Sequence, residues 1–150
     1  MIHLRPISDE NRAAVLALRV SPAQEQFVSS VAESLQEAAD EPGGRAVHHA
    51  VYAGETPLGF VMWSEDVDGP EYIPNYLWKL LIDEQHQRRG HGSAVLDLVA
   101  ERFRARGVAV MSTSAGQGDG SPIAFYERYG FVQTGDIVFD GEVLLELPLR

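Results

Sequence analysis

The chain has 150 residues, of which 45% are hydrophobic and 23% charged, a composition that predicts one soluble globular domain over 1–150. Its formal charge of −10 disfavours nucleic acid as a partner, because an acidic surface repels the phosphate backbone, and favours a cationic small molecule. The absence of cysteine excludes disulfides, a thiol nucleophile and thiolate metal sites.

The first segments predict a strand and two helices. "IHLR" alternates apolar and polar residues as a half-buried strand does, and Ser8 can cap a helix over about 9–19. Ser21 and Gln24 then have the spacing of a capping box, followed by apolar residues at helical intervals up to Leu35. Since "EPGG" ends this pattern, we expect one continuous second helix that begins after Ser21.

The middle of the chain predicts strands and then a long helix. "AVHHAVYAG" and "TPLGFVMWSED" read as two strands joined by a turn at Gly54 and Glu55, and "NYLWKLLID" as a third. A helix begins after Gly90 and ends at Gly107, which can supply a left-handed cap. The apolar spacing of this helix predicts that it buries Val95, Leu98, Val99 and Phe103.

The last third adds a strand, a short helix and a hairpin. "VAVMSTS" is the strand, "SPIAFYERYG" a helix capped by Ser121 and Gly130, and "FVQTGDIVFDGEVLLELPL" the closing hairpin. Mixed strands and helices without repeats favour a single α/β sheet over a helical bundle or a β-sandwich.

The turn "QRRGHG" lies between a strand and a helix, where unpaired backbone N–H groups and the helix dipole attract phosphate. A P-loop would need Lys and then Ser or Thr after its last glycine, whereas Gly92 is followed by Ser93 and Ala94. A dinucleotide fingerprint would need a third glycine at Val95 and a place after the first strand. Both nucleotide-binding motifs are therefore disfavoured, and a purely structural turn with solvated arginines is the remaining alternative.

This turn resembles the Gln/Arg-x-x-Gly-x-Gly/Ala signature of the GCN5-related N-acetyltransferase (GNAT) family. "LWKLLIDEQHQRRGHG" has the family's order of strand, polar link and phosphate loop, and "FYERYGF" is similar to its downstream Tyr segment, so the resemblance covers roughly 75–131. "SPAQEQFVSSVAESLQEA", "YAGETPLGFVM" and "GDIVFDGEVLLELPL" look like the bacterial spermine/spermidine acetyltransferase branch. The resemblance implies an α/β (α+β) fold with a mixed, mostly antiparallel sheet flanked by helices, and a splayed strand pair that holds acetyl-CoA.

The resemblance also implies where acetyl-CoA binds. The backbone of Leu80, Leu81 and Ile82 would follow the pantetheine arm, and a side chain at Gly92 would crowd the pyrophosphate. One of the two arginines can equally face water, and Ser121 can equally be a plain helix cap, with Asp119 as another polar contact. The residues implied around the cofactor are Gln87, Arg88, Arg89, Gly90, His91, Gly92, Ser93, Ser121 and Phe125.

Tyr126 is the implied general acid for the departing CoA thiolate. A phenol with a pKa of about 10 is protonated at neutral pH and can pass its proton to a thiolate whose conjugate acid has a pKa of about 8.5. The alternative is that Tyr126 is a packed aromatic residue like Phe125 and Phe131.

The general base is harder to assign. An alkyl ammonium with a pKa of about 10 must lose a proton before it attacks the thioester. Many relatives carry a Glu on the strand that enters the cofactor loop, but here Asn75 and Tyr76 stand there. Glu33, Glu65 and Glu71 can reach the site only through folding, and a solvated surface position is the alternative for each.

The acceptor site is expected among acidic and aromatic residues. Glu33 and Glu37 are four residues apart, so they would share a helical face and could offer paired negative charge to a polycation. Glu71 lies in another acidic segment, before the central strand, that relatives use around the acceptor. Trp78, Tyr72 and Trp63 could line an amine channel, although buried core aromatics and an ordinary acidic surface are the alternatives.

Together these observations predict an acetyl-CoA-dependent N-acetyltransferase for a small primary amine, with polyamines favoured. An aminated antibiotic or a protein N-terminus are other acceptors, and a non-catalytic acyl-CoA sensor is the alternative class. The five histidines lack the spacing of a metal site, so no metal is expected. No apolar run is long enough for a membrane span or signal peptide, which predicts a cytoplasmic protein. A homodimer is one assembly that the sequence leaves open.

Overall fold

A computed structural model describes residues 1–149, and its strands form one seven-stranded sheet. The sheet order is β1-β2-β3-β4-β5-β7-β6, and within it β4 and β5 are parallel while the other neighbours are antiparallel. This mixed sheet confirms the predicted fold class. The strands are β1 (Ile2–Arg5), β2 (Ala46–Ala53), β3 (Thr56–Ser64), β4 (Tyr76–Ile82), β5 (Val110–Ala115), β6 (Val132–Val138) and β7 (Glu142–Pro148).

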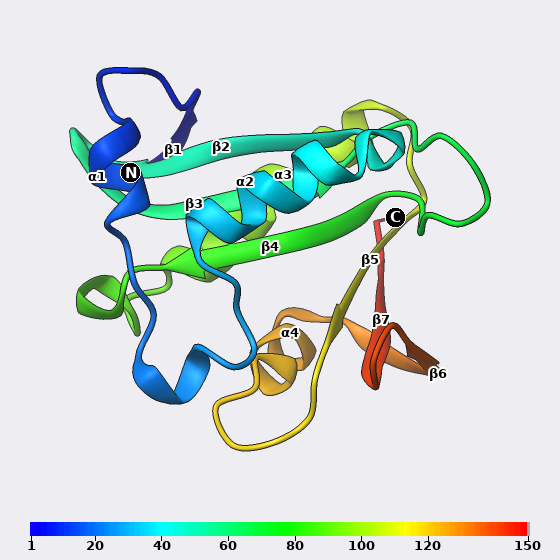
Figure 1. Cartoon of the computed structure of the whole chain (residues 1–150). Coiled ribbons are helices and arrows are strands. Elements are labelled where there is room, and N and C mark those ends of the chain that lie inside the picture. The colour runs from blue at the N-terminus through cyan, green and yellow to red at the C-terminus, as the bar shows by residue number, and fades with distance from the viewer. Residues whose placement is uncertain (150) are drawn as a thin grey trace.

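Helices cover both faces of the sheet, with α2 in front of β2–β4 and α3 behind them (Figure 1). Phe60 and Met62 of β3 pack with residues of α1 and α2, whereas Val61 and Trp63 pack with α3 and α4. Burial on both faces explains why β3 and β4 read as nearly continuous apolar runs. The helices are α1 (Arg12–Leu16), α2 (Val31–Asp40), α3 (His91–Ala105) and α4 (Ile123–Tyr129), with 3₁₀ turns η1 (Pro22–Gln24), η2 (Pro42–Gly44) and η3 (Glu84–His86).

The two parallel strands separate soon after they meet. β4 and β5 pair only at Tyr76 with Ser112 and at Leu77 with Thr113. Beyond that point β5 runs away from β4 toward α4 (Figure 1). The segment from Trp78 to Ile82 therefore borders a gap on the side opposite β3, where backbone groups have no strand partner.

The first helix is shorter than its sequence pattern predicts. α1 spans only Arg12–Leu16, with Asn11 at its N-cap, and the Asn11 Oδ1 accepts a hydrogen bond from the Ser8 backbone N–H at 2.8 Å. The expected cap by the Ser8 side chain is wrong, because the Asn11 side chain holds residues 8–11 in a turn.

The expected continuous second helix is also wrong, since the structure divides it into η1 and α2. The Gln24 Oε1 does accept from the Ser21 N–H at 3.1 Å, as the capping box predicts. A second capping box then starts α2, in which Ser30 Oγ accepts from the Glu33 N–H at 3.1 Å and Glu33 Oε1 from the Ser30 N–H at 2.9 Å. The second box therefore starts α2 as a separate helix.

α3 ends near Gly107 as expected, and Gly107 is left-handed with φ +77°. Its buried stripe differs at one position, because Leu98 is 38% exposed while Leu96 is fully buried. The buried face of α3 therefore includes Leu96 in place of the expected Leu98, together with Val95, Val99 and Phe103. No helix within residues 1–149 combines the length and the apolar character that crossing a membrane requires.

Candidate functional site

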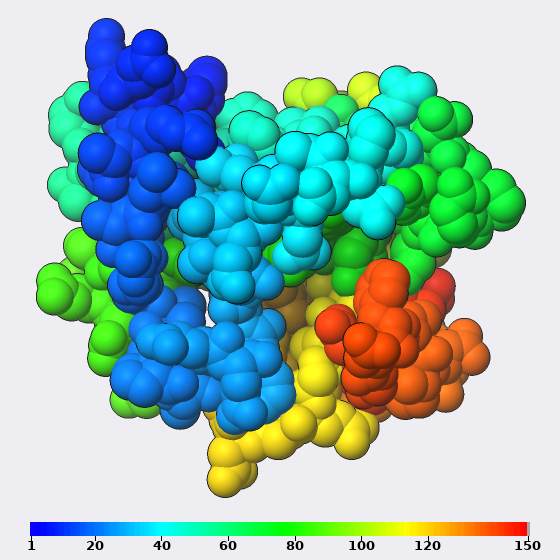
Figure 2. Space-filling view, in the orientation of Figure 1, coloured from blue at the N-terminus to red at the C-terminus, as the bar shows by residue number. Residues whose placement is uncertain are grey.

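Two cavities open at the gap between β4 and β5, and they share lining residues. The loop cavity, about 1030 Å³, lies between the end of β4, the 83–90 loop, the start of α3 and α4. The acidic cavity, about 570 Å³, lies between α2, the loop before β4, β5 and the start of β7. Figure 2 shows a hollow bordered by the blue segment before α2, cyan α2 and the orange hairpin. Both cavities are lined by Val28, Leu80, Pro122 and Tyr126.

The loop cavity gathers most of the residues that the sequence predicts for the cofactor. Two predicted residues lie outside it: the Leu81 side chain is buried in the core with Phe60, and Arg89 is exposed. The lining includes Leu80, Ile82, Gln87, Arg88, Gly90, His91, Gly92, Ser93, Ser121 and Phe125.

The loop's conformation depends on left-handed residues and one glutamine. Arg88 and Gly90 have φ values of +65° and +78°, and Gly90 is the N-cap of α3. Gln87 Nε2 donates to Ile82 O at 2.8 Å and to Gln24 Oε1 at 2.9 Å. The loop is thereby tied to β4 and η1, and the first turn of α3 presents its N–H groups to the cavity.

Gly92 lacks room for a side chain because of a neighbouring ring within the protein. A Cβ built on Gly92 would lie 2.9 Å from Phe125 Cζ. The sequence-based expectation placed the pyrophosphate there, whereas the structure places Phe125 of α4 against the first turn of α3. Ser121 is a turn residue before α4, with its Oγ donating to Gly116 O and accepting from the Ile123 N–H at 3.3 Å.

Tyr126 is both a packed aromatic residue and part of the cavity wall. It is 6% exposed, and its ring centroid lies 5.3 Å from those of Phe125 and Phe131. Burial raises its pKa to about 12, although hydrogen bonding with Thr113 opposes the rise. Its hydroxyl is therefore a neutral proton donor where the two cavities meet.

The acidic cavity combines carboxylates with aromatic rings. Among the described lining residues, four are acidic and Lys79 is the single basic one. The aromatic part includes Trp78 and Tyr72, whose hydroxyl donates to Glu41 Oε2 at 2.7 Å, and this hydrogen bond raises the pKa of Tyr72 to about 12. A cation inside would meet negative charge and aromatic faces together. The acidic residues are Glu37, Glu41, Glu71 and Glu142.

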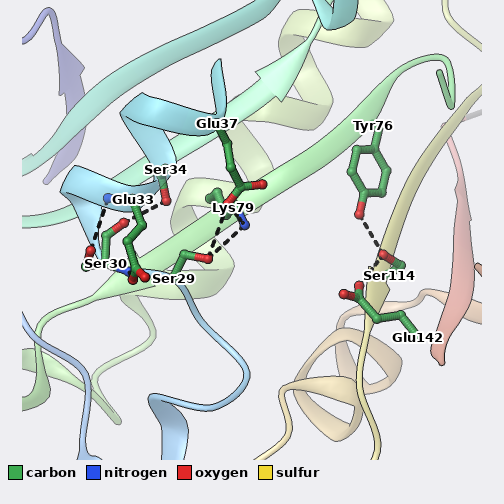
Figure 3. Close-up of polar contacts among 9 residues, drawn as sticks. All are labelled: Ser29, Ser30, Glu33, Ser34, Glu37, Tyr76, Lys79, Ser114 and Glu142. Atoms are coloured by element: carbon green, nitrogen blue, oxygen red, sulfur yellow. Dashed lines mark hydrogen bonds and ion pairs between the residues drawn. The ribbon is translucent and has the colours of Figure 1, made fainter. Parts of the chain in front are cut away.

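The expected pair of Glu33 and Glu37 does not act as one unit (Figure 3). Glu33 accepts a hydrogen bond from the Ser30 backbone N–H in the capping box of α2, and this contact lowers the pKa of Glu33. Glu33 lines neither cavity. Glu37 lines the acidic cavity and forms an ion pair with Lys79, Oε2 to Nζ at 2.9 Å. Lys79 Nζ also donates to Ser29 Oγ at 3.0 Å.

Glu65 and Trp63 have structural surroundings outside the two cavities. Trp63 is 1% exposed in the core, and its Nε1 donates to Glu65 Oε2 at 2.9 Å. A hydrogen-bonded ion pair with Arg102 of α3 lowers the pKa of Glu65 to about 2. Glu65 thus joins β3 to α3 and is removed from the candidate bases, as Trp63 is from the candidate channel residues.

A hydrogen-bonded chain crosses three strands (Figure 3), and no local sequence pattern indicates it. Tyr76 OH lies 2.6 Å from Ser114 Oγ, which donates to Glu142 Oε1 at 2.6 Å. All three residues line the acidic cavity. Only the pairing of β4 with β5 and of β5 with β7 brings them together. Within 1–149, no three His, Cys, Asp or Glu side chains group closely enough to hold a metal ion.

Comparisons with known proteins agree on one family. Residues 12–131 match the model of the Acetyltransferase (GNAT) family. The chain is 28% identical to the spermine/spermidine N(1)-acetyltransferase of Bacillus subtilis (strain 168), over 96% of each chain. It superposes on the GNAT domain of S. lividans PAT with a TM-score of 0.73 and 20% identity, covering 97% of this chain and 89% of that one. It also superposes on the PaiA N-acetyltransferase of Thermoplasma acidophilum, a structure in complex with coenzyme A. The TM-score is 0.67 and the sequence identity 15%, with 99% of each chain covered.

Proposed function

The chain belongs to the GNAT acetyltransferase family and is an N-acetyltransferase, and we propose that it acetylates a primary amine of a polycationic small molecule, with spermidine or spermine favoured. The observation that carries this proposal is the acidic cavity, whose described lining contains four carboxylates, several aromatic rings and one lysine. This cavity meets the loop cavity at Leu80 and Tyr126, so an amine inside it would be close to a cofactor bound beside the loop.

The loop cavity has the features that acetyl-CoA needs. Unpaired backbone along the end of β4 suits an extended pantetheine arm, and the turn from Gln87 to Ser93 offers N–H groups for a pyrophosphate. Arg88 adds a positive charge beside this turn. When bound, acetyl-CoA supplies an activated acetyl thioester whose leaving group is a thiolate.

The residues at the junction have complementary roles in this proposal. A backbone N–H near Leu80 would polarise the thioester carbonyl, as oxyanion donors do. Tyr126 holds its proton until a thiolate forms beside it and then donates it. The carboxylates of the acidic cavity hold the remaining ammonium groups of the acceptor and so orient its terminal amine.

The proposal is tested by measuring CoA thiol release with spermidine, spermine and a monoamine of similar length. We expect kcat/KM to be at least about tenfold higher for the polyamines, since additional charge pairs each contribute about 1 kcal/mol. The advantage should shrink as salt rises above about 0.15 M, where screening acts over roughly 8 Å. Equal constants for monoamine and polyamine, or no salt dependence, would exclude polyamines, and an absence of thiol release with every amine would favour an acyl-CoA sensor.

A further inference from the structure

We propose that Tyr76, Ser114 and Glu142 form a proton relay that takes the proton from the acceptor ammonium before it attacks the thioester. The inference rests on the proposed function and supplies the general base for it. Tyr76 is the group that contacts the amine, and Ser114 and Glu142 act through it.

The directions of the hydrogen bonds follow from the chemistry of the three groups. An ionised Glu142 carboxylate can only accept, so Ser114 Oγ donates its single proton to Oε1 at 2.6 Å. Ser114 must then accept from Tyr76 OH, which lies 2.6 Å away. The lone pairs of the Tyr76 oxygen are therefore free to accept a proton from a cation in the cavity.

The position of Tyr76 suits this contact. Its side chain lines the acidic cavity together with Tyr126, which also lines the loop cavity. The fully buried Ser64 holds its backbone, because Ser64 Oγ accepts from the Tyr76 N–H at 3.0 Å. The phenolic oxygen is thus fixed in the cavity that the amine must occupy.

The proton count balances over three transfers. A proton passes from the ammonium nitrogen to Tyr76 O while the Tyr76 proton passes to Ser114 Oγ and the Ser114 proton to Glu142. The products are a neutral amine, unchanged Tyr76 and Ser114 hydroxyls, and a protonated Glu142. No phenolate forms, which matters because burial and the charge of Glu142 raise the pKa of Tyr76 well above its ordinary value. Glu142 is only partly buried and can return the proton to water.

Other ionisable groups face the same cavity and affect its pH response. Lys79 is paired with Glu37, and Tyr72 with Glu41, so these four are held in contacts of their own. None of them is hydrogen-bonded to the relay. The groups around it are Glu37 and Glu41 from α2 and its end, Glu71 and Tyr72 from the loop, Lys79 from β4 and Tyr126 from α4.

The test is the pH profile of kcat/KM for spermidine in wild type and in Glu142→Gln. With the relay, the enzyme uses the ammonium form of spermidine directly. The wild-type kcat/KM should then change by less than about threefold between pH 7 and 9. Without it only free neutral amine reacts, and its fraction rises about tenfold per pH unit below a pKa of about 10. We expect the kcat/KM of Glu142→Gln to be about five hundredfold lower than that of wild type at pH 7 and to approach it near pH 10, because the neutral fraction of the amine rises by about that factor over this range.

Three further variants separate the relay from structural effects. Ser114→Ala and Tyr76→Phe should show the same steep profile, with unchanged CoA affinity and melting temperature. Glu146→Gln, on the exposed side of the same strand β7, should keep the wild-type profile. If Glu142→Gln and Ser114→Ala retain the flat profile while wild type is active, the relay is wrong and the proposed function stands. If wild type releases no thiol with any amine, the proposed function fails and the relay fails with it.

Discussion

Tyr76 and Tyr126 are two of the three tyrosines that line the acidic cavity, and their hydrogen-bond partners suit opposite proton-transfer roles. Burial raises the pKa of both, so both are neutral at pH 7. Tyr126 has Thr113 beside it, whose hydroxyl is committed to Leu77 O at 3.0 Å. Tyr76 instead leads through Ser114 to the Glu142 carboxylate. A phenol without an acceptor chain suits proton donation, whereas one connected to a carboxylate suits proton removal.

Tyr126→Phe should lower turnover by a factor on the order of a hundred to ten thousand, the usual contribution of general acid–base assistance. The ring packing against Phe125 and Phe131 is kept, so CoA affinity and thermal stability should hardly change. Steady-state thiol release, calorimetric CoA titration and thermal melting measure the three quantities. Turnover equal to wild type with a good acceptor would take Tyr126 out of the mechanism.

Tyr126 could be proposed as the general acid from the sequence because its motif, "FYERYGF", is local. Glu142 could not, since it contacts Ser114, 28 residues earlier, which in turn contacts Tyr76, 38 residues before it. Such contacts depend on strand order and register, which no local pattern encodes. The spacing of Glu33 and Glu37 misled for a related reason: helical periodicity was correct, but the capping box at Ser30 engages Glu33.

At the scale of elements, the division of the second helix into η1 and α2 contributes to the site. The linking segment carries Val28, which lines both cavities, and Ser29, which accepts from Lys79. One continuous helix would bring different residues to this place. The sequence contains both capping boxes, but local propensity does not decide between one helix and two when both boxes are satisfied.

The contact of α3 with α4 is tested by Gly92→Val. The new side chain would meet the Phe125 ring, and overpacking of this kind costs about 1–3 kcal/mol. We expect CoA affinity to fall on the order of tenfold and turnover to fall with it, because α4 also carries Tyr126. Calorimetry and thermal melting follow the two effects.

A matched double variant identifies the cause of that effect. If the Phe125 ring is the obstacle, Gly92→Ala combined with Phe125→Leu should bind CoA better than Gly92→Ala alone. No recovery in the double variant would restore the simpler explanation that a side chain at Gly92 obstructs the pyrophosphate. Normal CoA affinity in Gly92→Val would contradict both explanations and the assignment of the loop.

Across the whole molecule, the net charge of −10 favours the proposed cationic acceptor but does not say where it would bind. Some carboxylates form ion pairs away from the acidic cavity, as Glu65 does with Arg102 and Glu55 with Arg5. Others gather around one cavity, because α2, the loop before β4 and the start of β7 meet there. The expectation of a cationic acceptor came from composition, whereas the location of its proposed site depends on contacts between distant segments.

Lys79→Met tests whether this concentration of charge recruits the acceptor. The variant keeps an apolar stem of similar length but removes the single cation of the lining, so Glu37 becomes available to the substrate. One additional charge pair of about 1 kcal/mol should lower the KM for spermidine about threefold to tenfold at low salt. The gain should disappear at about 0.5 M salt because of screening.

Lys79→Arg is the matched control for this last prediction, since it keeps the positive charge facing Glu37 and should leave the KM near that of wild type. A monoamine should gain less than spermidine from Lys79→Met, because its single ammonium is the one that reacts and none remains to pair with Glu37. If the KM for spermidine rises in Lys79→Met while the melting temperature is unchanged, then Lys79 itself orients the acceptor. In that case the carboxylates do not recruit it through net charge, and recognition depends on the paired arrangement of Lys79 and Glu37 as it stands.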